Sequence, residues 1–186
     1  MINLENGTDL IVFSSEAFGS TEVRTTKLIT HLALTKRVYF IEAPIIGLSK
    51  DPTYFLKKNE HEVTIVQPYL PAQLSVFEQK HVLLELIKEL IHDENIIHYT
   101  AWTDSPKSMA FIRNLSSEIV VYDCIHNYSN SHPELEQEIF QYADLILTAS
   151  YSGHGDEGVF SPEDLSKDLD HFIGGHRAGH VTSARV

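Results

Sequence analysis

The segment DLIVFSS, residues 9–15, is the first of several short apolar runs, and the interpretation of the fold starts from it. It is rich in apolar and β-branched residues and ends in two serines, a pattern typical of a buried strand. RTTKLITHLAL (24–34) then places its apolar residues at helical spacing, and RVYFIEAP (37–44) is a second apolar run that stops at Pro44. This order predicts a βαβ unit with parallel strands.

The same alternation continues to about residue 150, with residues 45–61 expected to form a short helix or loop around Pro52. The further segments are strands at 63–71, 96–102, 118–124 and 144–150, and helices at 75–95, 106–115 and 133–143. Because the strands are continuous apolar runs, we expect both faces of the sheet to be covered. The sequence therefore predicts an α/β fold with a doubly wound, mainly parallel sheet and right-handed crossovers.

The length of 186 residues fits one domain with a short appendage. The regular pattern stops near residue 151, so we expect a folded domain over 1–151 and a hinge-like, flexible tail over 152–186. A net charge of −12 argues against nucleic acid or an anionic bilayer as the main partner, although it leaves room for a local basic face.

We expect no signal peptide, because MINLENGTDL has no basic segment followed by an apolar one. No apolar run reaches the roughly 20 residues that a membrane span needs. Its single cysteine, Cys124, excludes an intrachain disulfide and suits a reducing compartment. We therefore expect a cytoplasmic protein with no transmembrane segment. Cys124 itself is interpreted as a buried, inert thiol, because the neighbouring carboxylate of Asp123 disfavours a thiolate.

Two motifs near the end of the chain resemble ligand sites but are not expected to be any. Gly153, Gly155 and Gly158 spell G-x-G-x-x-G, yet the intervening DE pair would repel a pyrophosphate and no apolar-faced helix follows. This disfavours a nucleotide-dependent oxidoreductase. The histidines of HFIGGHRAGH (171–180) are separated by a Gly pair, so we expect a solvated terminus and no metal site.

The candidate site residues follow from the expected topology. Ligands of doubly wound sheets lie outside the carboxyl ends of the strands. The polar or aromatic residues at these ends, or at the start of the first helix, are Ser15, Arg24, Glu42, Trp102, Asp123 and His126. They are expected to line one concave surface, where Arg24 would bind a polyhydroxyl or anionic ligand and Trp102 would stack on a sugar ring.

Each candidate also has a purely structural interpretation that the sequence leaves open. Asp123 or His126 can cap the following helix, Trp102 can pack in the core, and Arg24 can be a surface arginine beside Glu22. Capping and ligand binding remain equally open for the serines at 14–15 and for the carboxylate at position 42.

The order of these segments resembles the N-terminal half of bacterial glycosyltransferases of the GT-B fold, in the group 1-like family. One subgroup carries FSH-x-x-W, QRPQHL, VFFVEEP, VVYDCMDEL and ADLVFT, where this chain has DLIVFSS, VRTTKL, RVYFIEAP, VVYDCIHNYS and ADLILTAS. DLDHF (168–172) echoes the GVDxxHF hinge that leads into the second lobe of that subgroup. The resemblance spans about residues 9–150 and implies a Rossmann-like domain that binds a carbohydrate or glycoconjugate acceptor.

The resemblance also implies roles for individual residues. His126 stands where the broader family often has a histidine that contacts the donor sugar or the acceptor, which implies a catalytic role for His126 and for Asp123. Substrate would be bound by Ser15, Glu42 and Trp102 together with Arg24. Arg24 matches the arginine of the QRPQHL motif, since Arg is the second residue of both QRPQHL and VRTTKL. CIHNYS lacks the acidic pair of CMDEL.

GT-B enzymes bind the nucleotide-sugar donor chiefly in a C-terminal lobe, which these 186 residues do not include. The resemblance therefore implies either the acceptor-side domain of a larger enzyme or a truncated product. In both cases the chain needs no cofactor of its own, is inactive alone, and lacks the donor-binding lobe with which it would work. The alternative is a non-catalytic binding or regulatory module on the same kind of sheet. Donor, acceptor and stereochemistry are not encoded in any motif that we identify.

Overall fold

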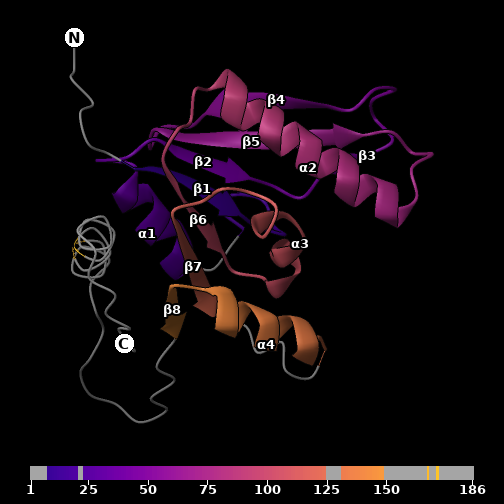
Figure 1. Cartoon of the computed structure of the whole chain (residues 1–186). Helices are drawn as coiled ribbons and strands as arrows, with labels where there is room; N and C mark the ends of the chain where they lie inside the picture. Colours follow the sequence, from indigo (N-terminus) through magenta and orange to yellow (C-terminus); the bar gives the residue numbers. More distant parts are fainter. Residues whose placement is uncertain (1–7, 21–22, 125–130, 149–166, 168–170, 172–186) are drawn as a thin grey trace.

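The computed structural model describes residues 8–20, 23–124 and 131–148, together with the single residues 167 and 171. Figure 1 shows one sheet with helices packed against it. The strands are β1 (Asp9–Phe13), β2 (Val38–Ile41), β3 (Ile45–Ile46), β4 (Thr53–Lys58), β5 (Val63–Leu70), β6 (Tyr99–Thr103), β7 (Ile119–Cys124) and β8 (Leu145–Thr148). The helices are α1 (Val23–Leu32), α2 (Val76–Asp93), the 3₁₀ turn η1 (Pro106–Ser108), α3 (Met109–Ile112) and α4 (Pro133–Tyr142).

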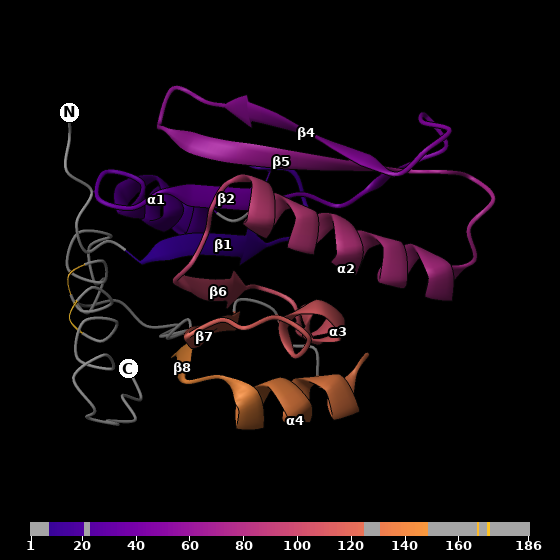
Figure 2. The same cartoon turned by 45° about the horizontal axis from the view of Figure 1, so that its top comes forward.

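The parallel strands lie in the order β3-β5-β2-β1-β6-β7-β8. From β1 the chain moves to β2 and β5 on one side, then crosses back to β6 and continues to β7 and β8 on the other. Right-handed crossovers that run in opposite directions place their helices on opposite faces. Accordingly, α1 packs on one face and α2, α3 and α4 pack on the other (Figure 2). The predicted doubly wound fold is confirmed.

Each face of the sheet has its own apolar core. Leu10 and Val12 of β1 belong to the core under α1, whereas Ile11 and Phe13 belong to the core under α2. Successive side chains of a strand point to opposite faces, so a strand that is apolar throughout joins both cores. Full burial of each such side chain stabilises the fold by about 1.5–3 kcal/mol. We call these two surfaces of the sheet the α1 face and the α2 face.

The connection between β2 and β5 differs from the prediction. Residues 45–61 were expected to form a helix or loop, but they form β3 and the edge strand β4, which pairs antiparallel with β5. The side chain of Asn59 builds the turn between β4 and β5, because its Oδ1 accepts from the N–H groups of His61 (2.9 Å) and Val63 (3.0 Å). TYFLKK has high strand propensity, and this turn lets it fold back on β5.

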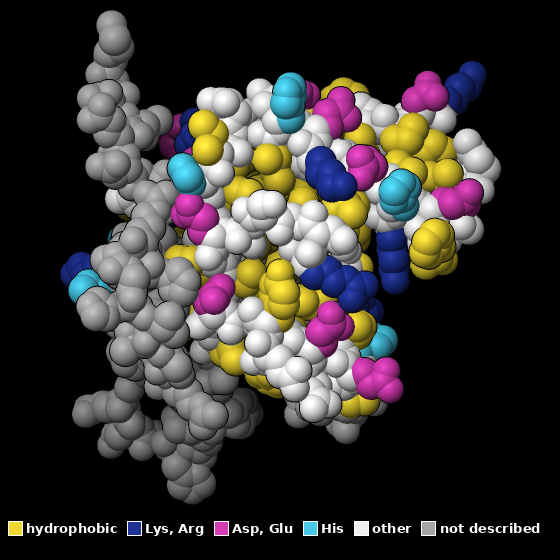
Figure 3. All heavy atoms as spheres, in the orientation of Figure 1, with side chains coloured by type: hydrophobic (Ala, Val, Ile, Leu, Met, Phe, Trp, Pro, Cys, Tyr) yellow, Lys and Arg dark blue, Asp and Glu magenta, His cyan; other side chains and the backbone are white. Residues whose placement is uncertain are grey.

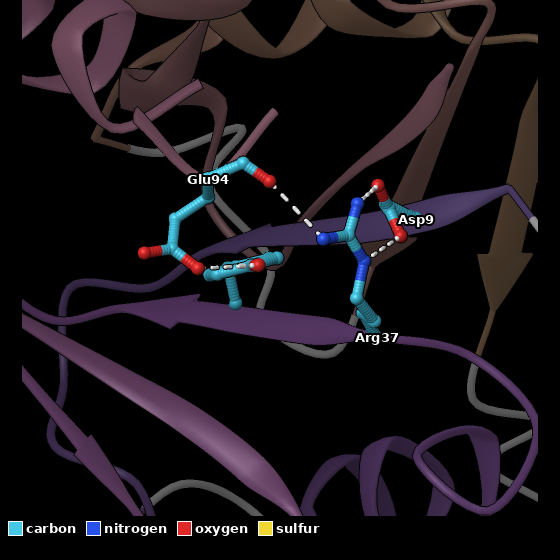
Figure 4. A network of polar contacts seen from close by, with 4 residues as sticks. Asp9, Arg37 and Glu94 are labelled. Atoms are coloured by element: carbon cyan, nitrogen blue, oxygen red, sulfur yellow. Dashed lines mark hydrogen bonds and ion pairs between the residues drawn. The ribbon is translucent and has the colours of Figure 1, made fainter. Parts of the chain in front are cut away.

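At the amino edge of the sheet, Arg37 ties β1, β2 and the end of α2 together (Figure 4). Its guanidinium donates from Nε to Asp9 Oδ1 at 2.8 Å and from Nη1 to the carbonyl oxygen of Glu94 at 3.1 Å. The hydroxyl of Tyr39 donates to Glu94 Oε2 at 2.9 Å. Burial, with this hydrogen bond, raises the pKa of Tyr39, so the hydroxyl remains a neutral donor. The network fixes the edge opposite the candidate site described below.

Helix α2 begins with a reciprocal cap. The Ser75 Oγ accepts from the Glu78 N–H at 3.3 Å, and Glu78 Oε2 accepts from the Ser75 N–H at 2.8 Å. This capping box satisfies two backbone donors that the first turn would otherwise leave without helical partners. Leu83, Leu86 and Ile87 then form part of the buried stripe on the α2 face. The sequence prediction of a helix over 75–95 is therefore confirmed, with Ser75 as its cap.

We expect the Ser75→Ala change to lower the free energy of unfolding by about 1 kcal/mol, because it removes one side of the capping box. Urea denaturation of the purified chain measures this. Gln73→Ala, an exposed change two residues earlier, is the control and is expected to shift the free energy by less than about 0.5 kcal/mol. Equal losses in both variants would contradict a stabilising cap.

Candidate functional site

A cavity of about 520 Å³ opens at the carboxyl ends of β1, β2 and β5, between the start of α2, the η1–α3 segment and the start of α4. Its lining includes Ser14 and Ser15 after β1 and Ser105 after β6. These are the two strands between which the chain reverses its direction along the sheet. Ligands of doubly wound sheets bind at this point, and the volume is typical of small-molecule sites. Figure 3 shows the surface hollowed between α2 and α4.

A hydrogen bond joins the two diverging halves of the sheet at the cavity. Ser14 Oγ donates to Asp104 Oδ2 at 3.2 Å, linking the residue after β1 to the residue after β6. The same Oγ accepts from the Glu16 N–H at 3.1 Å, which starts the loop toward α1. Ser15 lies next to this bond, exposed and facing the cavity. The serines predicted from DLIVFSS therefore hold the site together and line it.

Glu42 enters the cavity from the end of β2. Its N–H still donates to the Val66 carbonyl oxygen at 3.0 Å, so the residue remains tied to β5 after the regular pairing of β2 stops. Its Oε1 accepts from the Phe18 N–H at 2.8 Å and thereby fixes the loop between β1 and α1. Glu42 is half-buried and lines the cavity. It therefore combines a structural contact with a place at the site, the two interpretations that the sequence left open.

Basic side chains lie on the helical side of the cavity. Lys80 comes from α2, Lys107 from η1, and Arg113 from the end of α3. Arg113 Nη1 lies 3.3 Å from Oε1 of Glu138 on α4. Within the described part of the chain, neither Lys80 nor Lys107 forms an ion pair. Among the described residues, the cavity therefore presents two ammonium groups outside any ion pair and one paired guanidinium.

The floor of the cavity is apolar and buried. It is formed by side chains that belong to the core of the α2 face and are at most 7% exposed. They are Phe13, Ile41, Leu70, Leu83, Ile87 and Met109. Such a floor accepts an apolar ligand surface and fixes the positions of the polar groups around it.

The structure brings together only some of the six residues predicted from the sequence. Ser15 and Glu42 line the cavity. Trp102 is 1% exposed and Asp123 is 0% exposed, and both point to the α1 face, away from the cavity. The expectation of one shared concave surface is therefore not met for these two. The physical reason is strand alternation. Within a strand, the position of a residue decides on which face of the sheet its side chain lies, and only residues beyond the strand ends are free of this constraint.

The roles expected for Trp102 and Asp123 change accordingly. Trp102 packs in the α1-face core, which was the alternative interpretation, so its ring is not presented for stacking on a sugar. The carboxylate of Asp123 is buried and accepts a hydrogen bond from Thr25 Oγ1 of α1 at 3.0 Å. Asp123 therefore links β7 to α1, and its burial keeps it from contacting a bound acceptor as a catalytic residue would.

Some predictions fall on parts that the structure does not describe. His126 and the side chain of Arg24 lie outside the described residues, as do the domain boundary near 151, the glycine motif of 153–158 and most of the tail. Of the tail histidines only His171 is described, and it is exposed. Among the described residues there is no group of three or more His, Cys, Asp or Glu side chains that could hold a metal ion. The half-buried side chain of Cys124 packs against the core of the α2 face.

The sequence interpretation missed the helical side of the cavity. Gln79, Lys80, Lys107 and His132 all line it, yet none follows a strand directly. The right-handed crossover rule could have revealed this side of the cavity. It places the helices expected at 75–95, 106–115 and 133–143 on one face of the sheet, so their first turns lie together at the carboxyl edge.

Comparison of this chain with protein-family models, curated proteins and solved structures finds no match. None of the helices in the described residues has both the length and the apolar composition that a bilayer crossing requires.

We expect the Thr25→Val change to lower the free energy of unfolding by about 1.5–3 kcal/mol, because it removes a donor from a buried carboxylate. Thr25→Ser, which keeps the hydroxyl, is the matched control and is expected to retain most of this free energy. Urea denaturation followed by tryptophan fluorescence reports on both, since Trp102 lies in the same core. If serine and valine destabilise equally, the hydrogen bond is not what stabilises the contact.

Proposed function

We propose that this chain is the N-terminal, acceptor-binding domain of a glycosyltransferase that uses a nucleotide-sugar donor. One observation carries the proposal: the cavity at the reversal point of the sheet joins Ser14, Ser15 and Glu42 from two strand ends. Hydroxyl groups both donate and accept hydrogen bonds and a carboxylate accepts them, which is the combination that sugar hydroxyls require. The resemblance of residues 9–150 to GT-B enzymes supports the same assignment.

In this proposal, Ser15 and Glu42 bind acceptor hydroxyls while the apolar floor packs against the rest of the molecule. Arg24 and His126 keep their proposed contacts to substrate, with His126 as the catalytic candidate. The donor is bound by a separate lobe, so this domain needs no cofactor. The proposal includes a cytoplasmic location, with which the single cysteine agrees.

Blocking the cavity tests the acceptor site. We expect the wild-type chain to give saturation-transfer NMR signals with members of a panel of soluble mono- and oligosaccharides. Ser15→Trp would fill the cavity and abolish these signals. Ser116→Trp is the matched control, since Ser116 is also exposed but precedes β7 at the opposite edge, and it should bind as the wild type does. Equal signals from both variants would refute a saccharide site in this cavity.

We expect the 186-residue chain alone to give no steady sugar transfer or donor hydrolysis with any nucleotide sugar. The departing nucleoside diphosphate needs positive groups or helix N-termini aimed at it, and the proposal assigns these to the donor-binding lobe. A coupled assay for nucleoside diphosphate release measures this. Steady turnover by the pure chain would show that it binds and activates the donor by itself, contrary to the division proposed here.

A further inference from the structure

A part of the α1 face lies beyond helix α1. On β1 and β2, the side chains of this face, such as Val12 and Phe40, are at most 2% exposed. On β4, and on β5 after Val63, the side chains of the same face are half-buried or exposed, and Phe55 of β4 is 63% exposed. β4 forms the margin of the sheet (Figure 2). The sheet therefore leaves a band along these two strands accessible to solvent.

Strand alternation decides which side chains form this band. Ile65 packs beside the core of the α1 face, and every second residue of β5 shares its face. The antiparallel register places alternate residues of β4 on the same face, where Phe55, for example, is opposite Gln67. We call this set of side chains the β4–β5 strip. It consists of Thr53, Phe55, Lys57, Ile65, Gln67 and Tyr69.

Two aromatic rings lie side by side in the strip. The ring centroids of Phe55 and Tyr69 are 5.4 Å apart and the ring planes are 90° apart, so the edge of one ring meets the face of the other. This contact orients both rings while Phe55 stays largely exposed. Polar groups lie beside them, namely the hydroxyl of Thr53 and the amide of Gln67, whose Nε2 donates to the Ala43 carbonyl oxygen at 2.9 Å. The strip therefore combines an oriented aromatic surface with hydrogen-bonding side chains.

We propose that the β4–β5 strip binds a neutral polysaccharide chain, at a site distinct from the cavity, which lies on the α2 face. The C–H groups on the face of a sugar ring stack on the negative face of an aromatic ring, and the hydroxyl groups at its edge need hydrogen-bond partners. Phe55 provides the stacking surface, and Thr53 and Gln67 provide the hydrogen bonds. The six residues of β4 span about 20 Å, which accommodates several consecutive sugar rings. This inference goes beyond the proposed function and does not rest on it.

The size and charge of the strip disfavour a protein or a nucleic acid as its ligand. Two strands form a band about 10 Å wide and about 20 Å long, or about 200 Å², whereas a specific protein interface buries about 800 Å² on each partner. Lys57 is the one charged member of the strip, since Lys58 lies on the other face and pairs with Glu62, so a nucleic-acid backbone would meet a single cation. A neutral sugar polymer is narrow and repeats its contacts, so it matches both limits.

Native affinity electrophoresis tests the strip. The full chain is run through gels without polysaccharide and through gels that contain dextran, laminarin, galactomannan or soluble starch. We expect at least one of these neutral polymers to retard the wild-type chain. Phe55→Leu keeps an apolar side chain but removes the ring, and it should weaken the binding about fivefold. Phe55→Tyr keeps the ring and should be retarded as the wild type is.

Phe77→Leu is the matched control, because Phe77 is 82% exposed but lies on α2, which packs on the other face of the sheet. It should be retarded as the wild type is. Absence of retardation in every gel, or equal losses from Phe55→Leu and Phe77→Leu, would overturn the proposal. Sedimentation velocity without polysaccharide checks for a second copy of the chain. A dimer that Phe55→Leu dissociates would show that this copy occupies the strip, and would also overturn the proposal.

A cavity variant separates the strip from the acceptor site. One stacked ring binds weakly, so the strip does not hold the short saccharides of the cavity test, whereas a polymer engages it repeatedly. Ser15→Trp should therefore leave the retardation unchanged. If Ser15→Trp abolishes it, the polymer binds in the cavity, and this inference fails while the glycosyltransferase proposal stands. Retardation that depends on Phe55 and not on Ser15, without saccharide signals in the NMR test, would support the strip and refute the saccharide site in the cavity.

Discussion

β1 and β6 are neighbours in the sheet, yet the chain leaves them in opposite directions, and the rest of the structure depends on this divergence. Right-handed crossovers on the two sides must carry their helices to opposite faces, so none of the helices in the described residues covers the carboxyl edge between β1 and β6. The hydrogen bond from Ser14 to Asp104 joins the segments that follow β1 and β6 at this point, and Ser14 also lines the cavity. The strand order therefore sets where the cavity lies, and particular side chains then line it.

The two faces of the sheet divide the work between them. On the α1 face, Thr25 and Asp123 connect helix to strand and Trp102 fills the core, so the polar groups there are used internally. On the α2 face, the first turns of the helices meet the strand ends with space between them, and polar groups such as Lys80 and Lys107 point to that space. Both faces carry an apolar core, but the candidate cavity lies on the α2 face.

The fold was predictable because apolar strands and amphipathic helices alternate clearly along the sequence. The edge strand β4 was not, since its stability comes from pairing with β5 and from the side chain of Asn59. Ser15 and Glu42 were found at the cavity because they follow strand ends. Trp102 and Asp123 were expected at the same surface but lie on the α1 face, because the sequence does not show at which residue each strand ends.

The edge strand β4 has a consequence for how this protein behaves at high concentration. Phe55 and Leu56 are exposed on this strand, and its outer backbone groups have no neighbouring strand among the described residues. Such unpaired groups can form hydrogen bonds with a strand of another molecule. Lys57 and Lys58 follow them directly; Lys58 pairs with Glu62, and Lys57 adds a positive charge at the end of that edge. Edge-to-edge pairing of two copies would bring like charges close together, so the charge on this strand opposes association at its unpaired edge.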